Sequence, residues 1–388
     1  EGQVVPRIGV GEVRISEKAK QNVARVLDTR RLSYGPFSRE FERRFADLHG
    51  KRFACFVSSG TDALRIGLAA LKEKHHWGRG SVVVPALTFV ASVNAIIQVG
   101  LWPRFVDIEL DTYGIGKVDE AYGDVAIMPV HLFGHPVKRE VITWAREHGY
   151  RIIDDSCESM FVPGIADGDV SCFSTYACHV ISTGVGGLAA TDDPELATLI
   201  RSYANHGRDG IYVGIDDALG NHETMDARFR FERSGFSSRA TELEAAIGCA
   251  ELDEWRENIE ARRRVASQLY TELCGLPLYV PRTRYADSSW MMFPIRTEDQ
   301  KTRDALTLHL ERSGIETRPL LPLLSQPYIR SLFGDMREQY PNAWTAETTG
   351  FYVGSYPSMS EEDTEHIGKT FRDFFRTRDR VFAVGGRG

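Results

Sequence analysis

Phe53-Ala-Cys-Phe-Val-Ser-Ser-Gly-Thr-Asp-Ala-Leu-Arg-Ile-Gly-Leu68 is the stretch of the sequence that decides the fold. An apolar, β-prone run is followed by small polar residues and then by helical spacing, which predicts a strand, a tight turn and a helix. Gly60 permits close approach of the backbone, and the first N–H groups of a helix favour a phosphate group. The segment is neither a Walker loop nor a G-x-G-x-x-G turn. An ordinary capped turn remains an alternative on this segment alone.

Short apolar runs and helical segments alternate through the first two thirds of the chain. The predicted strands are 53–57, 81–84, 104–106, 125–130, 151–153, 170–173 and 187–190. Helices over 62–74 and 90–99 lie between them. Several of the strands are apolar throughout, as expected for strands buried on both faces. The pattern therefore predicts an α/β layered domain around a largely parallel sheet.

The rhythm changes near residue 260. Thr241-x-x-Glu244 resembles a capping box that opens a helix over 242–255, and the charged run 256–266 predicts a helix with a solvated face. A strand pair near 290–296, a helix over 304–313 and a strand near 316–319 follow. We therefore predict a large domain over residues 1–260 and a smaller α+β domain over residues 261–388.

Composition excludes several classes of protein. The chain has 388 residues, 42% of them hydrophobic and 26% charged, with a formal charge of 47 − 54 = −7. Without a basic block we expect neither nucleic acid nor an anionic membrane as a partner. The longest apolar-leaning stretch, 81–99, contains Pro85, Asn94 and Gln98 and does not predict a membrane span.

The cysteines and the first residues of the sequence bear on metal binding and cellular compartment. The six cysteines form no C-x-C or C-x-x-C pair, so no metal site is predicted. Most of them lie in apolar runs, which suggests buried, reduced thiols. The first residues do not resemble a secretory signal, and we expect a cytoplasmic protein.

Further motifs follow one another along the chain. They are Arg31-Leu-Ser-Tyr-Gly-Pro36, Val84-Pro-Ala-Leu-Thr-Phe-Val-Ala-Ser-Val-Asn94, Phe105-Val-Asp107, Pro129-Val-His-Leu-Phe-Gly134, Asp154-Asp-Ser-Cys-Glu158, Asn205-His-Gly-Arg-Asp209, Arg239-Ala-Thr-Glu-Leu-Glu-Ala-Ala-Ile-Gly248, Gly314-Ile-Glu-Thr-Arg-Pro319 and Gln326-Pro327. In this order they resemble the DegT/StrS-type sugar aminotransferases, across nearly the whole chain. The resemblance implies an aspartate-aminotransferase-like, fold-type I, three-layer domain with a smaller C-terminal α+β domain. It also implies dependence on pyridoxal phosphate, a nucleotide-linked keto-sugar as substrate, and a homodimer.

The resemblance assigns roles to individual residues. Gly60 and Thr61 would bind the cofactor phosphate, with a further contact from Ser174. Phe89 would stack on the pyridine ring. Asp155 would pair with the pyridinium nitrogen and make the ring an electron sink, and Glu158 would lie near the phenolic oxygen. The alternative for Phe89 is a core residue, and Asp155 taken by itself is better explained as a turn residue or helix cap.

One departure decides the expected chemistry. Relatives carry the cofactor lysine in a segment like Phe-Ser-x-x-x-x-Lys-x-x-x-x-Gly-Glu-Gly-Gly, whereas this chain has His179 at the lysine position and Val185 at the glutamate position. No lysine occurs between Lys138 and Lys301. An imidazole cannot form the Schiff base that tethers the cofactor, but it can donate and accept protons near neutral pH. We therefore expect non-covalent pyridoxamine phosphate (PMP) or pyridoxal phosphate (PLP).

The exchange of lysine for histidine resembles the keto-sugar 3-dehydratase branch of the family. That branch removes the C3 hydroxyl of a 4-keto sugar, and His179 would act as its acid and base. An iron–sulfur sub-branch is disfavoured because it carries a C-x-C pair, so glutamate is the expected amino donor. A sugar aminotransferase with an unusual proton shuttle and a catalytically silent cofactor-binding regulator remain alternatives. Ser237 stands where many relatives have an asparagine, and no substrate-binding residue is predicted.

Overall fold

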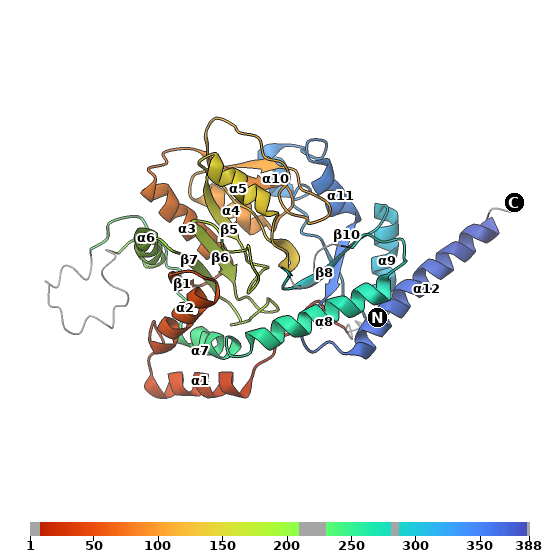
Figure 1. Ribbon diagram of the computed structural model, residues 1–388, viewed down its shortest axis with the longest axis horizontal. Coiled ribbons are helices and arrows are strands. Elements are labelled where there is room, and N and C mark those ends of the chain that lie inside the picture. The colour runs from red at the N-terminus through yellow and green to blue at the C-terminus, as the bar shows by residue number, and fades with distance from the viewer. Residues whose placement is uncertain (1–7, 209–229, 281–286, 386–388) are drawn as a thin grey trace.

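A seven-stranded sheet forms the centre of the first part of the chain. The computed structural model describes residues 8–208, 230–280 and 287–385 (Figure 1). The strands of this sheet are β1 (Phe53–Val57), β2 (Ser81–Pro85), β3 (Trp102–Val106), β4 (Asp124–Ile127), β5 (Arg151–Asp155), β6 (Val170–Ser174) and β7 (Gly187–Thr191). Their order is β1-β7-β6-β5-β4-β2-β3, and β7 alone runs antiparallel to its neighbours β1 and β6. The prediction of a largely parallel sheet is therefore confirmed.

Helices lie on two sides of this sheet. They are α1 (Glu17–Thr29), α2 (Pro36–Leu48), α3 (Gly60–Lys74), α4 (Val90–Gln98), α5 (Arg139–Glu147), α6 (Pro194–Ala204), α7 (Glu242–Glu251) and α8 (Trp255–Leu273), with a 3₁₀ turn η1 (Leu132–Gly134). α3 and α4 pack on the face of the sheet that carries Val82, Val84 and Ile153. α5 packs on the opposite face with Val83, Ile127 and Ile152. The arrangement has the three layers expected of an aspartate-aminotransferase-like fold.

A second, three-stranded sheet forms the centre of the remaining chain. Its order is β8 (Met292–Arg296), β10 (Gly350–Gly354) and β9 (Arg318–Pro319), and all pairs are antiparallel. The helices of this part are α9 (Gln300–Arg312), α10 (Pro327–Phe333), α11 (Pro341–Thr349) and α12 (Glu361–Gly385). The expected mixture of helices and short strands after residue 260 is therefore present.

Two hydrophobic cores meet along α8. Ile259 packs in the core of the large sheet, whereas Val265 packs in a separate core with Phe293 and Phe351. Ile8 also packs in this second core. The division into residues 1–260 and 261–388 thus stays a proposal. The two cores do not separate at this boundary, since Met291, Leu320 and Ile329 pack in the first core and Ile8 packs in the second.

Some predicted boundaries are wrong for local reasons. The predicted strand 125–130 ends at Ile127, close to Pro129, which has no N–H for a sheet hydrogen bond. The predicted helix 242–255 is two helices, because i to i+3 hydrogen bonds from Asp253 and Glu254 tighten the chain after α7. The helix predicted over 304–313 begins earlier, at Gln300, where Asp299 caps it.

Three negative or partial findings concern membranes, metals and thiols. Of the helices in residues 8–208, 230–280 and 287–385, none is long and apolar enough to cross a membrane. The same residues contain no group of three or more His, Cys, Asp or Glu side chains placed to hold a metal ion. All six cysteines are free, and Cys55, Cys172 and Cys249 are buried, whereas Cys274 is exposed.

Candidate active site

One cavity of about 450 Å³ gathers every residue that the sequence singled out for cofactor binding or catalysis. Gly60, Thr61, Phe89, Asp155, Glu158, Ser174 and His179 all line it. The cavity lies where β1, β2, β5 and β6 end and their loops begin. Because the carboxyl ends of parallel strands share one edge of a sheet, residues far apart in the sequence meet there. Met291, Met292 and Tyr352 close the cavity from the smaller sheet.

The start of α3 forms one wall of the cavity. The Ser59 hydroxyl accepts the N–H of Asp62 at 3.1 Å and caps the helix. A Cβ atom on Gly60 would lie 2.7 Å from Sγ of Cys157 and 2.8 Å from Cβ of Ser174, so only glycine fits. The predicted close approach of the backbone is therefore present. The positive end of the helix dipole and the Thr61 hydroxyl suit a phosphate group.

Asp155 is a buried carboxylate at the end of β5. Its Oδ2 accepts the Ser92 hydroxyl at 2.6 Å, and its Oδ1 accepts the Cys157 N–H at 3.2 Å. Burial raises the pKa of Asp155, and these hydrogen bonds oppose the rise. Among the described residues no cation forms an ion pair with this carboxylate. A buried, unpaired anion at a cavity wall fits a ligand that brings its own positive charge, such as a pyridinium nitrogen.

Phe89 lies at the rim of the cavity and precedes α4. Phe89 is 57% exposed, which contradicts the alternative of a core phenylalanine. An aromatic ring that is half free in a cavity wall is available to stack on a planar ligand.

Glu158 and Ser174 complete the predicted cofactor set. Oε2 of Glu158 accepts the N–H of Phe133 at 2.8 Å, and burial raises the pKa of Glu158 to about 7. Ser174 is the last residue of β6, and its hydroxyl accepts the N–H of Tyr176 at 3.3 Å. Glu158 is thus able to carry a proton near neutral pH, and Ser174 has a hydroxyl proton left to donate.

His179 lies in the turn between β6 and β7 with one ring nitrogen occupied. Its Nδ1 lies 2.8 Å from the carbonyl oxygen of Cys157. Because a carbonyl oxygen only accepts, Nδ1 carries the proton of the neutral ring and Nε2 carries its lone pair. The backbone of Ser174 is a second hydrogen-bond partner of the ring. Burial lowers the pKa of His179 to about 4, so the ring is neutral at physiological pH. No lysine is among the described residues that line the cavity.

The remaining histidines of the sequence motifs do not line this cavity. His131 is buried behind it: Nδ1 accepts the N–H of Val137 at 3.1 Å, and Nε2 lies 3.5 Å from Asp154. His135 is buried against Trp290. His206 and Ser237 are exposed, and Asp209 lies outside the described residues.

Sequence reasoning missed three features of the site. Ser92, whose hydroxyl donates to Asp155, lies inside the motif Val84–Asn94, and the resemblance of that motif to the family assigns no role to Ser92. The only signal for Ser92 is its place four residues after Thr88, which precedes α4 and whose hydroxyl lies 2.6 Å from that of Ser92. Tyr352 carries no local signal. Arg262, expected on a solvated helix face, is 2% exposed, and its Nη2 donates to the His179 carbonyl oxygen at 3.1 Å.

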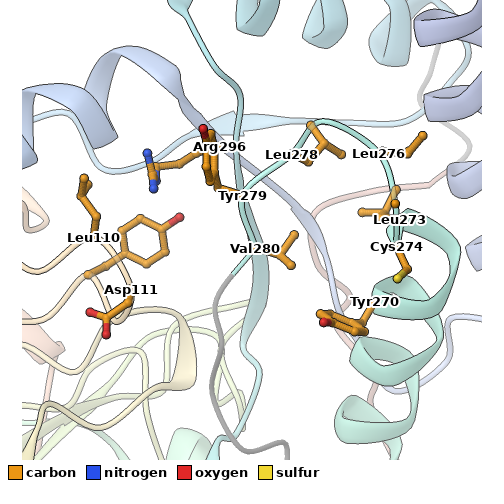
Figure 2. Close-up of a pocket in the computed structure, with 12 residues that line it drawn as sticks. Leu110, Asp111, Tyr270, Leu273, Cys274, Leu276, Leu278, Tyr279, Val280 and Arg296 are labelled. Atoms are coloured by element: carbon orange, nitrogen blue, oxygen red, sulfur yellow. The ribbon is translucent and has the colours of Figure 1, made fainter.

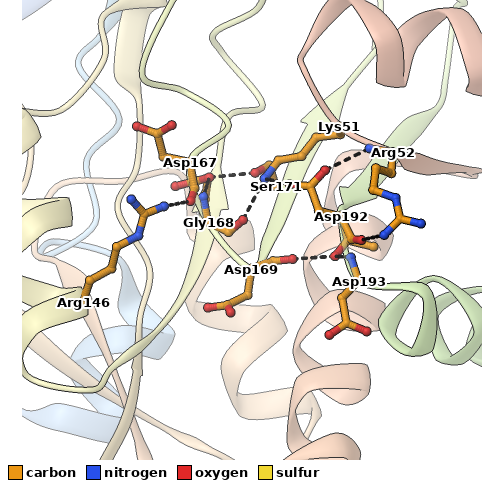
Figure 3. A network of polar contacts seen from close by, with 11 residues as sticks. Lys51, Arg52, Arg146, Asp167, Gly168, Asp169, Ser171, Asp192 and Asp193 are labelled. Carbon is orange, nitrogen blue, oxygen red and sulfur yellow. Dashed lines mark hydrogen bonds and ion pairs between the residues drawn. The ribbon is translucent and has the colours of Figure 1, made fainter.

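Two other polar or hollow regions lie away from this cavity. A cavity of about 520 Å³ has Asp111 on one side and Tyr270 on the other (Figure 2), and none of the predicted site residues lines it. Figure 3 shows a network in which Lys51 donates to the Gly168 carbonyl oxygen at 2.9 Å. The N–H of Gly168 in turn donates to Asp154 at 2.6 Å. This network stabilises the loop that precedes β6.

The fold and the cavity together define a class of protein. A largely parallel three-layer domain with a buried aspartate, an aromatic ring and a helix start around one cavity is the arrangement of fold-type I, PLP-dependent enzymes. Residues 13–372 match the DegT/DnrJ/EryC1/StrS aminotransferase family, and the chain belongs to that family. The resemblance found in the sequence and the expectation of an enzyme of this class are therefore confirmed.

Named relatives cover nearly the whole chain. GDP-perosamine synthase of Caulobacter vibrioides is 29% identical over 382 residues, which are 94% of this chain and 97% of the relative. GDP-4-keto-6-deoxy-D-mannose 3-dehydratase of Yersinia pseudotuberculosis is 30% identical over 372 residues, 90% and 94% of the two chains. The solved E. coli GDP-4-keto-6-deoxy-D-mannose 3-dehydratase with bound hydrated PLP has a TM-score of 0.86 at 24% identity. This alignment covers 95% of this chain and 100% of that one, and it supports the fold.

Proposed function

We propose that this chain is a PMP/PLP-dependent 3-dehydratase that removes the C3 hydroxyl of a nucleotide-linked 4-keto sugar. The observation that carries the proposal is the neutral imidazole of His179, with Nδ1 on the Cys157 carbonyl oxygen, in a cavity whose described lining contains no lysine. A relative that is 30% identical over 90% of the chain bears the name of such a dehydratase.

The described residues supply a non-covalent site for the cofactor. Gly60, Thr61 and Ser174 would hold its phosphate, and Phe89 would stack on its ring. Asp155 would pair with the ring nitrogen, and Glu158 would lie near the phenolic oxygen. When bound, the cofactor supplies an electron sink through which a hydroxyl beside a ketone can leave. Without a covalent link, these contacts must provide all of the retention.

His179 would move the protons. Its Nε2 lone pair accepts a proton as a base, because burial and the Cys157 carbonyl oxygen keep the ring in that neutral tautomer. The same nitrogen, once protonated, can donate to the departing hydroxyl. One histidine would therefore perform both steps, and the buried Asp155 carboxylate would stabilise the positive charge on the ring nitrogen of the cofactor.

The overall reaction balances with glutamate as reductant. The sugar loses its C3 oxygen as water, and glutamate becomes 2-oxoglutarate and ammonia with its new carbonyl oxygen taken from water, so that no net water is formed. An aminotransferase would instead place the nitrogen on the sugar and release no ammonia. We propose a homodimer as the active form.

The test is incubation of the protein with PMP, glutamate and a GDP- or dTDP-linked 4-keto-6-deoxy sugar. Mass spectrometry of the sugar should show loss of one oxygen, with equal amounts of ammonia and 2-oxoglutarate. A sugar that gains an amine would support the aminotransferase instead. Cofactor binding without any change in the sugars tried would favour the silent regulator. Borohydride treatment with PLP should leave no cofactor attached to lysine.

A further inference from the structure

Two side chains of α8 hold the backbone beside the proposed catalytic histidine. Arg262 Nη2 donates to the carbonyl oxygen of His179 at 3.1 Å, and Asn258 Nδ2 donates to that of Val180 at 2.7 Å. Arg262 Nε also donates to Asn258 Oδ1 at 2.9 Å. Because residues four apart share one face of a helix, Asn258 and Arg262 act as one unit on this turn.

The same guanidinium reaches the smaller part of the protein. Its Nη1 donates to the carbonyl oxygens of Met291 at 3.0 Å and Ser355 at 2.7 Å. Met291 lines the cavity, and Ser355 directly follows the strand that carries Tyr352, another lining residue. Arg262 therefore joins the turn of His179 to the opposite wall of the cavity. Figure 1 shows α8 running between the regions of the two sheets.

The charge of Arg262 is not neutralised by a direct partner. Its hydrogen-bond acceptors are three carbonyl oxygens and one amide oxygen, and among the described residues it forms no ion pair with a carboxylate. Burial lowers the pKa of Arg262 to about 10, so the group is still a cation at neutral pH. A second positive charge on the neighbouring imidazole is disfavoured by such a cation.

Other charged and titratable groups surround His179. Asp155, Glu158 and Cys157 come from β5 and the segment after it, and Tyr352 comes from β10. Glu251 from α7 and Glu12 from the N-terminal segment lie on the side of Arg262. Cys178 and Tyr176 belong to the turn itself. Arg14, Glu254, Glu257 and Arg264 also line the pocket on this side. The carboxylates favour a protonated imidazole, and the cations, of which Arg262 is the buried one, oppose it.

We propose that Arg262 is a positioning residue for His179: it fixes the turn that carries the ring, and its charge adds to the effect of burial, which keeps the imidazole in the neutral form that accepts a proton. The inference rests on the proposed role of His179 as a base. It does not depend on which sugar is the substrate.

The experiment follows the protonation of His179 in the protein without cofactor or substrate. Histidine side chains are labelled with ¹⁵N, and the His179 signals are assigned by their loss in His179→Asn. Arg262→Gln removes the charge, Arg262→Lys keeps it, and Arg264→Gln removes an exposed charge from the same helix. We expect the His179 midpoint to rise by about one pH unit in Arg262→Gln and to change by less than about 0.3 in the other two.

Each outcome has a fixed meaning. A folded Arg262→Gln protein, judged by circular dichroism, with an unchanged His179 midpoint overturns the proposal. If Arg262→Gln does not fold, Arg262→Lys tests the proposal instead. A rise of about one pH unit in the His179 midpoint of Arg262→Lys, which keeps the charge, would also overturn the proposal. Because the titration uses neither cofactor nor sugar, failure of the dehydratase assay leaves this result unaffected.

Discussion

The imidazole of His179 lies with Nδ1 2.8 Å from the carbonyl oxygen of Cys157, and this contact fixes the tautomer in which Nε2 carries the lone pair of the base. Cys157 in turn follows Asp155 by two residues and donates its N–H to that carboxylate. The proposed proton carrier and the proposed partner of the cofactor ring are therefore positioned by one short segment after β5. A substitution of His179 should therefore change the chemical step, whereas a substitution that affects Asp155 should change the binding of the cofactor.

His179→Asn should abolish the loss of oxygen from the sugar while the cofactor still binds. Asparagine keeps a donor for the Cys157 carbonyl oxygen but has no group that takes up a proton near neutral pH. We expect turnover to fall by about 10² to 10⁴, the usual contribution of a general acid–base group. Affinity for PMP, measured by calorimetry, should change by less than about threefold. A variant with full turnover would show that another group moves the protons.

Ser92→Ala should weaken the binding of PMP through Asp155. The variant removes the hydroxyl that lies 2.6 Å from Oδ2, so the ionised form of the buried carboxylate loses a donor. A hydrogen bond to a charged group contributes about 1.5–3 kcal/mol, which corresponds to a fall in affinity of at least about tenfold. Ser92→Thr keeps the hydroxyl and is the matched control. Equal affinities of the two variants would contradict the role of Ser92.

Local motifs predicted most of the site because each is a continuous segment at a strand end. Gly60, Asp155 and Ser174 were found from short patterns and from the order of those patterns. The parallel sheet then brings them to one edge, which needs no further detail of packing. The observed cavity contains all of the predicted residues for this reason.

The features that the sequence did not predict depend on packing between distant segments. The run Arg262-Arg-Arg264 has the composition of a solvated helix face, yet α8 lies against both cores and Arg262 is enclosed. Ser92 lies on α4, and the sequence alone does not show that this face of α4 lies beside the end of β5, where Asp155 is. Local spacing shows which residues share a helix face, but not what that face contacts.

Phe89→Leu should reduce the affinity for PMP without lowering the stability of the protein. The ring is 57% exposed, so its removal leaves no cavity in the core. Stacking of aromatic rings contributes about 0.5–1.5 kcal/mol beyond burial, which predicts a loss of affinity of about two- to tenfold. Phe89→Tyr retains the stacking face and should bind as the unchanged protein does. A fall in melting temperature of more than about 4 °C without cofactor would instead show a core role.

His135 should make the protein lose stability in acid. The ring is 1% exposed, and neither nitrogen has a hydrogen-bond partner within the described part of the chain. Burial lowers the pKa of His135 to about 3. The unfolded chain, with a histidine pKa near 6.5, therefore binds a proton in a range of pH where the folded chain does not. Above about pH 6.5 the buried, neutral His135 does not lower the free energy of unfolding. As the pH falls from about 6.5 toward 3, the free energy of unfolding decreases because the unfolded chain binds this proton.

His135→Phe should flatten this acid decline, because phenylalanine keeps an aromatic ring against Trp290, 4.6 Å away between centroids, and does not titrate. Between pH 8 and pH 5 we expect the free energy of unfolding to fall by about 2 kcal/mol less than in the unchanged protein. Burial also lowers the pKa values of His49 and His179 to about 4, so part of the decline should persist. Urea unfolding at several pH values measures the difference, with His76→Asn, a change at an exposed residue, as control. Parallel curves for His135→Phe and the unchanged protein would mean that His135 is not held neutral by burial.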